Sequence, residues 1–394
     1  MEPKPITMTA HMPKPFSVYL DLVRFLAACL VYVYHSNQRW LVEPILPASH
    51  YGHSSVIVFF VLSGYVIAFV TATKERDWQT YAASRLSRVF SVAIPAIVLT
   101  IALDAVGRQL VPSAYAYPFD WFGLRIAASL LMVNEAWFVS ITTFSNVPYW
   151  SICYESWYYV GFGLVAFLPG SRAWPVIGLL ALALGPKIVL LAPVWAMGVV
   201  LFRWRRLAEI SEGLGWALLA SSTAGIVIFH GLGVEEMAAS WFKSVVGKDW
   251  FVRFSFSRFF IGDYLLGLLV MLHFAGMRRV AGLMAPVLVA IERPVKLVAA
   301  YTFTLYLLHQ PLFLFWGAVL RGDPKTYVNW IATTCLVAVS VAAIGAATET
   351  RRHVLTRWIR QRLLAFGDGN RRFNAQPAGG NATAKDAAPL QSGS

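Results

Sequence analysis

Long apolar runs, separated by short polar and basic stretches, follow one another along almost the whole chain. A helix needs about 20 mostly apolar residues to cross the hydrocarbon core of a bilayer. The candidate segments are residues 17–36, 54–72, 89–107, 150–168, 173–185, 187–202, 214–230, 259–276, 297–320 and 328–347. Of these, the segment 173–185 is short for a span. The pattern predicts an all-α polytopic membrane protein of about ten transmembrane helices.

One further apolar stretch, residues 122–138, is interrupted by polar and charged side chains. These are Arg125, Asn134 and Glu135. Charges are costly in the hydrocarbon core, so we expect this stretch to be re-entrant or interfacial. In a second arrangement it crosses the membrane and 173–202 crosses once, which again gives ten spans but moves Arg172 to the outside. We favour the first arrangement.

The basic residues orient the chain, because cytoplasmic loops are enriched in Lys and Arg. They cluster at Lys4 and Lys14, at Lys74, Arg76, Arg85 and Arg88, at Arg203, Arg205 and Arg206, at Arg278, Arg279, Arg293 and Lys296, and from Arg351 onward. Ten crossings place all of these clusters and both termini in the cytoplasm. We therefore expect a cytoplasmic segment at 1–16, a membrane domain at 17–347, and a tail at 348–394 that is first basic and then, from 366, disordered.

Composition excludes a soluble globular protein. The 394 residues are 58% hydrophobic and 13% charged, whereas soluble domains carry roughly 25% charged residues. The net charge of +13 does not indicate nucleic acid, because the basic clusters lie between apolar runs and match the anionic cytoplasmic leaflet. Cys29, Cys153 and Cys335 are scattered in apolar stretches, so we expect neither a disulfide framework nor a metal site.

The first span carries three ionisable residues. Asp21 and Arg24 are three positions apart and can pair on a helix. His35 follows Arg24 by eleven positions, which is close to three whole turns, so these residues form one polar stripe. A helix-end ion pair with an interfacial histidine would explain them. The alternative is a functional stripe, in which a neutral His35 at the outer end is a suitable general base for a hydroxyl.

Other spans carry polar residues with a structural and a functional interpretation. Ser63 and Gly64 suit close helix packing, and His53 suits the interface. Arg85 and Arg88 share a helix face; they are either ordinary cytoplasmic charge or a phosphate site. Glu155, four positions after Ser151, needs a partner or a polar cavity in the membrane. His309 is either a structural histidine whose ring nitrogens are hydrogen-bonded or a member of a functional site.

Taken in order, these residues resemble the acyltransferase-3 family of membrane O-acyltransferases. The family pattern has an Arg and, eleven positions later, a His; then Phe-Phe-x-x-Ser-Gly, Arg-x-x-Arg, Trp-Ser-[Leu/Ile]-x-x-Glu and Tyr-Leu-x-His-x-Pro. The matching residues are Arg24 and His35; Phe59, Phe60, Ser63 and Gly64; Arg85 and Arg88; Trp150, Ser151 and Glu155; and Tyr306, Leu307, His309 and Pro311. The family often has Pro three residues after the second Arg, where this chain has Ser91.

The resemblance implies a bacterial inner-membrane enzyme with no tightly bound cofactor and no metal. It would transfer an acyl group, usually acetyl, from cytoplasmic acyl-CoA to a hydroxyl of an extracytoplasmic glycan or lipid-linked saccharide. His35 would be the general base, Arg24 would lie beside the thioester, and Arg85 and Arg88 would bind donor phosphates. Glu155 would orient the sugar or the imidazole. The rival interpretations are a transporter or flippase with a polar pathway, although no internal repeat supports it, and a succinyl- or longer-chain acyltransferase.

Overall fold

Helices joined by turns and irregular loops make up residues 12–207 and 209–374, the part of the chain that the computed structural model describes. Its α-helices are α1 (Lys14–Ser36), α2 (Gly52–Lys74), α3 (Trp78–Leu110), α4 (Phe122–Leu130), α5 (Trp150–Phe167), α6 (Ala173–Leu184), α7 (Pro186–Arg203), α8 (Glu212–Gly231), α9 (Val234–Val246), α10 (Lys248–Arg253), α11 (Phe260–Val280), α12 (Ala285–Ala290), α13 (Glu292–Ala299), α14 (Thr302–Leu320), α15 (Tyr327–Ala347) and α16 (Arg352–Asn374). Short 3-10 turns lie at η1 (Pro112–Ala114), η2 (Val147–Tyr149), η3 (Gly170–Arg172), η4 (Arg205–Leu207) and η5 (Ser255–Phe259). No strand occurs in these residues, which confirms the all-α prediction.

Eight helices in the described residues are long and apolar enough to cross a membrane: α1, α2, α3, α7, α8, α11, α14 and α15. The other two predicted spans are α5 and α6. Helix α5 has 18 residues, many of them Trp and Tyr, and its last residue, Phe167, packs against Tyr81 at the start of α3 with ring centroids 5.4 Å apart. Helix α6 has 12 residues, so at about 18 Å it is shorter than the hydrocarbon core of about 30 Å.

The stretch at 122–138 does not form a span. Helix α4 has nine residues, and the chain then runs irregularly to η2, which agrees with the re-entrant or interfacial prediction. A buried ion pair joins this irregular segment to α7: Lys187 Nζ lies 2.5 Å from Glu135 Oε2. The same ammonium donates to Val139 O at 2.7 Å and to Ser140 Oγ at 2.9 Å. All three ammonium hydrogens therefore have acceptors.

Removing one member of this pair is expected to destabilise the protein. Because the Lys187 and Glu135 side chains are 0% and 3% exposed, Lys187→Met leaves a buried carboxylate uncompensated, at a cost of about 3–5 kcal/mol. Thermal unfolding of the detergent-purified variant measures the loss. The double variant Lys187→Met/Glu135→Gln removes both charges and should recover part of it. A single variant as stable as the wild type would contradict the assignment.

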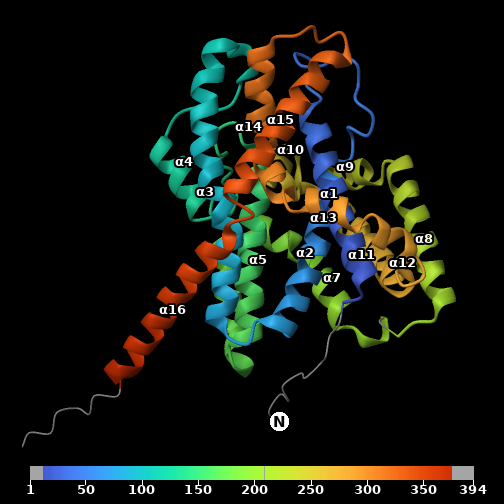
Figure 1. Cartoon of the computed structure of the whole chain (residues 1–394), viewed down its shortest axis with the longest axis vertical. Helices are drawn as coiled ribbons and strands as arrows, with labels where there is room; N and C mark the ends of the chain where they lie inside the picture. The colour runs from blue at the N-terminus through green and yellow to red at the C-terminus, as the bar shows by residue number, and fades with distance from the viewer. Residues whose placement is uncertain (1–11, 208, 375–394) are drawn as a thin grey trace, which may run out of the picture.

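The helices form a bundle with two distinct ends (Figure 1). Helices α1, α3 and α14 begin at one end, which we call the Arg88 end, and finish at the other, which we call the His35 end. Helices α2 and α7 approach each other closely, since a Cβ at Gly64 would lie 2.1 Å from Trp195 O and one at Gly198 would lie 1.9 Å from Val61 O. Gly64 is thus a packing residue, as small residues between membrane helices usually are.

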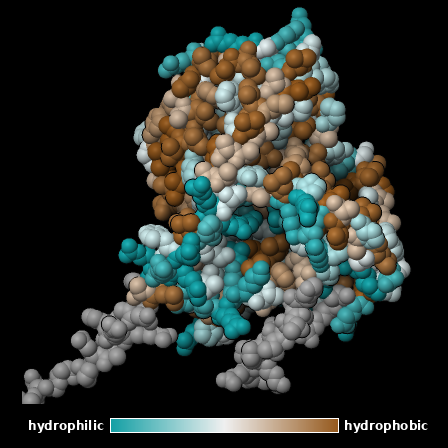
Figure 2. Space-filling model, viewed as in Figure 1, coloured by the Kyte–Doolittle hydropathy of each residue, from teal (hydrophilic) through white to brown (hydrophobic). Residues whose placement is uncertain are grey.

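Apolar surface forms a band across the face of the bundle seen in Figure 2. Figure 2 shows a brown band with hydrophilic residues above and below it. Large exposed apolar side chains include Val98, Leu179, Val227 and Val339, which is the arrangement of a surface solvated by lipid rather than by water. Both observations agree with a multi-pass membrane protein.

The tail contains more helix than the sequence predicted. Helix α16 extends to Asn374 and leaves the bundle at its lower end (Figure 1), so residues 366–374 are helical rather than disordered. The remaining residues of the predicted disordered segment, 375–394, lie outside the described residues. Near its start, α16 is fixed to α3 by Thr356 Oγ1, which lies 2.7 Å from Ser87 Oγ. The basic residues at the start of α16, such as Arg352, therefore lie at the Arg88 end.

Candidate active site

A small cavity near the Arg88 end gathers residues from α1, α2, α3, α5 and α14. Its volume is ≈ 60 Å³, room for a few water molecules. Its polar and charged lining residues are Arg24, Ser63, Arg85, Arg88, Ser151, Glu155, Tyr159, Thr302 and Tyr306. Most of the residues singled out in the sequence therefore meet at one place, although they come from five helices.

Arg24 and Arg88 are the two cavity arginines that a ligand could use. Arg24 Nη1 lies 3.0 Å from Asp21 Oδ1, so the ion pair expected from their spacing is formed, and Asp21 positions Arg24. Arg88 forms no ion pair within the described residues, and its guanidinium packs over the ring of Phe303 at 6.0 Å. Since both line the cavity, it carries an excess of positive charge that suits an anionic ligand.

Arg85 is placed differently from Arg88. Helix α3 begins at Trp78, with Asp77 as its N-cap accepting from Thr80 N at 2.6 Å, so both arginines lie well inside the helix. Arg85 forms a buried ion pair with Glu75, and its guanidinium packs over Tyr81 at 5.1 Å. Its charge is already compensated, which favours a structural contribution beside any contact with a ligand.

Glu155 is satisfied within a hydrogen-bonded group at the centre of the bundle. Ser63 Oγ donates to Glu155, lies 3.3 Å from the Tyr159 hydroxyl and accepts from Trp195 Nε1 at 3.2 Å. No hydrogen bond joins Glu155 to His35 in the described residues. The Glu155 side chain therefore lines the cavity together with the arginines, and it does not contact the His35 imidazole through a hydrogen bond in these residues.

Helix α14 closes the cavity on its remaining side. Its first turn is capped by Glu349, which accepts from Thr304 N at 2.9 Å and from Thr304 Oγ1 at 2.8 Å. Two residues further on, the Tyr306 hydroxyl lies 2.6 Å from Ser151 Oγ. Trp150, beside Ser151, stacks on Phe256 with ring centroids 4.2 Å apart. Trp150 is thus a packing residue, whereas Ser151 and Tyr306 line the cavity.

His35 and His309 form a pair above the cavity. His35 Nδ1 lies 3.2 Å from His309 Nε2 and 3.0 Å from Val31 O, while His309 Nδ1 lies 2.8 Å from Tyr306 O. A carbonyl oxygen only accepts, so both Nδ1 atoms carry hydrogen. The single hydrogen on His35 Nδ1 is then shared between Val31 O and His309 Nε2, both as acceptors, and His35 Nε2 keeps its lone pair. That nitrogen has no hydrogen-bond partner among the described residues.

Tyr306 connects the two halves of the site. It lines the cavity, and its ring lies 6.2 Å from that of His309 and 5.3 Å from that of Phe59. Arg24 and His35 are about 16 Å apart along α1, at 1.5 Å per residue. The cavity at Arg24 and the basic nitrogen of His35 thus lie at the two ends of the polar stripe of α1, with the rings of Tyr306 and Phe59 beside it.

The acyltransferase-3 family model, described as an acyltransferase domain, matches residues 17–349. The chain belongs to this family. Comparison with curated proteins and with solved structures gave no match. The protein is therefore an acyltransferase that is built as a multi-pass membrane protein, and the family assignment disfavours the transporter interpretation. The cavity and the histidine pair contain most of the family-pattern residues, namely Arg24, His35, Phe59, Phe60, Ser63, Arg85, Arg88, Ser151, Glu155, Tyr306 and His309.

Three residues near the cavity were not found from the sequence. Tyr159 continues the stripe of Ser151 and Glu155 at another four-residue step, so helical spacing could have revealed it. Glu349 lies 45 residues from Thr304, and Glu75 is separated from Arg85 by the turn between α2 and α3. No local pattern identifies such partners.

Proposed function

We propose that this acyltransferase moves an acyl group, preferably acetyl, from cytoplasmic acyl-CoA to a hydroxyl of an extracytoplasmic glycan or lipid-linked saccharide in the bacterial inner membrane. The observation that carries the proposal is the histidine pair. Val31 O and His309 Nε2 share the Nδ1 hydrogen of His35, and this favours the tautomer in which His35 Nε2 is a base. The pair lies at the end of the bundle opposite the basic residues, where such an acceptor would arrive.

In this reaction His35 Nε2 removes the proton of the acceptor hydroxyl as its oxygen attacks the thioester carbonyl carbon. The carbon–sulfur bond then breaks, the ester forms, and the CoA thiolate takes the proton from the imidazolium. The proton balance closes, and His35 is again neutral. A neutral imidazole suits this cycle because it can accept and return a proton near neutral pH.

The cavity would be the binding site for the acyl-CoA donor. Arg24 and Arg88 would bind anionic or polar groups of the donor, with Asp21 fixing the position of the Arg24 guanidinium. A cavity of ≈ 60 Å³ is far smaller than a coenzyme arm. The proposal therefore requires the rings of Tyr306 and Phe59 to move when the donor enters, so that the thioester reaches His35.

Transfer by the purified protein tests the function directly. The tag-free protein in lipid nanodiscs is supplied with acyl-CoA and a lipid-linked saccharide from a Gram-negative bacterium, and a base-labile ester on the sugar is measured by mass spectrometry. Acetyl-, succinyl- and octanoyl-CoA are compared in separate reactions. Ester formation fastest with acetyl-CoA supports the proposal, and preference for another donor selects the longer-chain interpretation. Transport of the saccharide without ester formation would refute it.

His309 is expected to act as a positioning residue through its contact with His35. His309→Gln keeps an oxygen that can accept from His35 Nδ1–H, whereas His309→Leu of similar size cannot. We expect His309→Leu to lower kcat by about 10- to 100-fold, with donor KM unchanged. The loss in His309→Gln should be smaller. Equal activity of the two variants at equal abundance would contradict the positioning role.

A further inference from the structure

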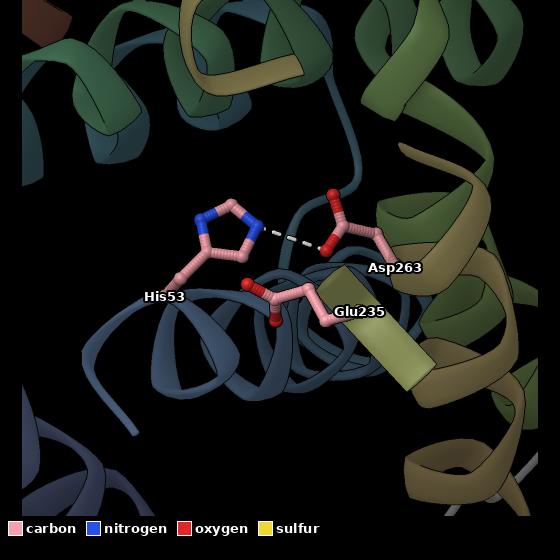
Figure 3. Close-up of side chains that lie close together, drawn as sticks. All are labelled: His53, Glu235 and Asp263. Carbon is pink, nitrogen blue, oxygen red and sulfur yellow. Dashed lines mark hydrogen bonds and ion pairs between the residues drawn. The ribbon is translucent and has the colours of Figure 1, made fainter. Parts of the chain in front are cut away.

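A second cluster of ionisable side chains lies at the His35 end of the bundle, outside the proposed site. His53 is at the start of α2, Glu235 at the start of α9 and Asp263 in the first turn of α11. Figure 3 shows the three side chains pointing toward one another from these separate helices. One ligand atom of each lies within 4.8 Å of the other two.

The observed hydrogen bond does not satisfy the cluster. His53 Nε2 lies 2.9 Å from Asp263 Oδ1, but Asp263 Oδ2 has no partner among the described residues although Asp263 is fully buried. Glu235 makes no hydrogen bond in the same part of the chain. A buried, unpartnered carboxylate oxygen is energetically costly, so this oxygen requires a further ligand.

Charge points to a cation as that ligand. Two carboxyl groups lie together, and the one basic group bonded to either of them within the described residues is the His53 imidazole. Arg258 does not neutralise them, since it forms no ion pair in the described residues and packs over Phe259 at 4.8 Å. That ring in turn packs on His53, with ring centroids 4.9 Å apart. A divalent ion would neutralise both carboxylates at once.

We propose that His53, Glu235 and Asp263 bind one divalent metal ion of the zinc class. One imidazole and two carboxylates are ligands that Zn²⁺ accepts, whereas Mg²⁺ and Ca²⁺ prefer oxygen alone. Bonds of about 2.0–2.2 Å need ligand atoms within about 4 Å of each other, so Glu235 closes on the ion by less than about 1 Å. The ion would tie together α2, α9 and α11.

The metal would also have an open side. Zinc sites with three protein ligands commonly keep a fourth position for water or a ligand. Glu235 lines a hollow of ≈ 940 Å³, whose other polar residues include His50, Ser54, Ser55 and His230. The fourth position is therefore available to a water or a hydroxyl-bearing ligand from this hollow.

Direct metal binding tests the inference without using transfer activity. Tag-free protein is stripped with EDTA, dialysed against Zn²⁺ and analysed for metal by mass spectrometry, and Zn²⁺ affinity is measured with a competing chelator. We expect one ion per wild-type chain. Asp263→Asn, His53→Gln and Glu235→Gln should each weaken binding by more than the about 10- to 100-fold that loss of an outer partner costs.

Two control variants locate the ion. Glu236→Gln removes the exposed carboxylate next to Glu235 and should leave Zn²⁺ affinity unchanged. His35→Ala should also retain the ion, which separates this cluster from the histidine pair. Wild-type protein that binds no Zn²⁺ overturns the proposal, even if a ligand variant misfolds. Zinc that remains in Asp263→Asn and His53→Gln, or is lost from His35→Ala, overturns it as well.

Discussion

Replacing His35 with glutamine is expected to lower the rate of acyl transfer by about 10²- to 10⁴-fold, the usual contribution of a general base. Glutamine can still hydrogen-bond to Val31 O and His309, but it has no basic nitrogen. The loss should appear in kcat, because the donor cavity near Arg24 is untouched. Steady-state kinetics of the nanodisc-embedded variant, with donor affinity measured separately, provide the measurement.

His50→Gln is the matched control for this variant. His50 lies at the same end of the bundle, is exposed and belongs to neither the cavity nor the histidine pair, so its replacement should leave kcat within about twofold. A His35→Gln enzyme that is abundant, folded and as active as the wild type would refute His35 as the base. A loss of donor binding equal to the loss of kcat would instead place His35 on the donor path.

Replacing Arg88 with glutamine is expected to raise the donor KM by about 10- to 100-fold. This corresponds to the roughly 1.5–3 kcal/mol that a hydrogen bond to a charged group contributes. Arg88 lines the cavity and has no ion-pair partner among the described residues, so its charge is available to a donor phosphate or carbonyl. Acceptor KM should stay within about twofold, because the acceptor approaches from the other end.

Arg76→Gln removes the same charge at the same end of the bundle. Arg76 is exposed and does not line the cavity, so its variant reveals how much of the effect is general attraction between a basic surface and an anionic donor. That component also falls as salt is added. An unchanged donor KM in Arg88→Gln, or an equal rise in Arg76→Gln, would contradict the role of Arg88.

Much of the fold followed from the sequence because the bilayer imposes a simple requirement. A spanning segment must satisfy its backbone internally and be apolar over about 20 residues. That rule located nine of the ten apolar helices to within five residues of their observed bounds. It was less informative where helices are short or pass into irregular structure, as at α4 and α6. It also began the third helix at residue 89, because the charged residues of its first turns, Arg85 and Arg88, are not apolar.

The candidate site was only partly predictable. Helical spacing placed Asp21, Arg24 and His35 on one stripe and Ser151 with Glu155 on one face, since 3.6 residues per turn fixes neighbours along a helix. It could not show that His35 contacts His309 or that Ser63 donates to Glu155. Those contacts join helices that are distant in sequence, and they depend on how the helices pack.

The sequence by itself therefore determined a multi-pass helical membrane protein and the family pattern of its polar residues, since hydropathy and helical periodicity are local properties. Tertiary structure decided how the ionisable residues are used. It paired Arg85 with Glu75 and left Arg88 without an ion pair in the described part of the chain. It also turned Glu155 toward Ser63 and oriented His35 through His309. It also assembled His53, Glu235 and Asp263. The physical reason is that a buried charge or polar group takes its role from the partner that compensates it, and that partner comes from another helix.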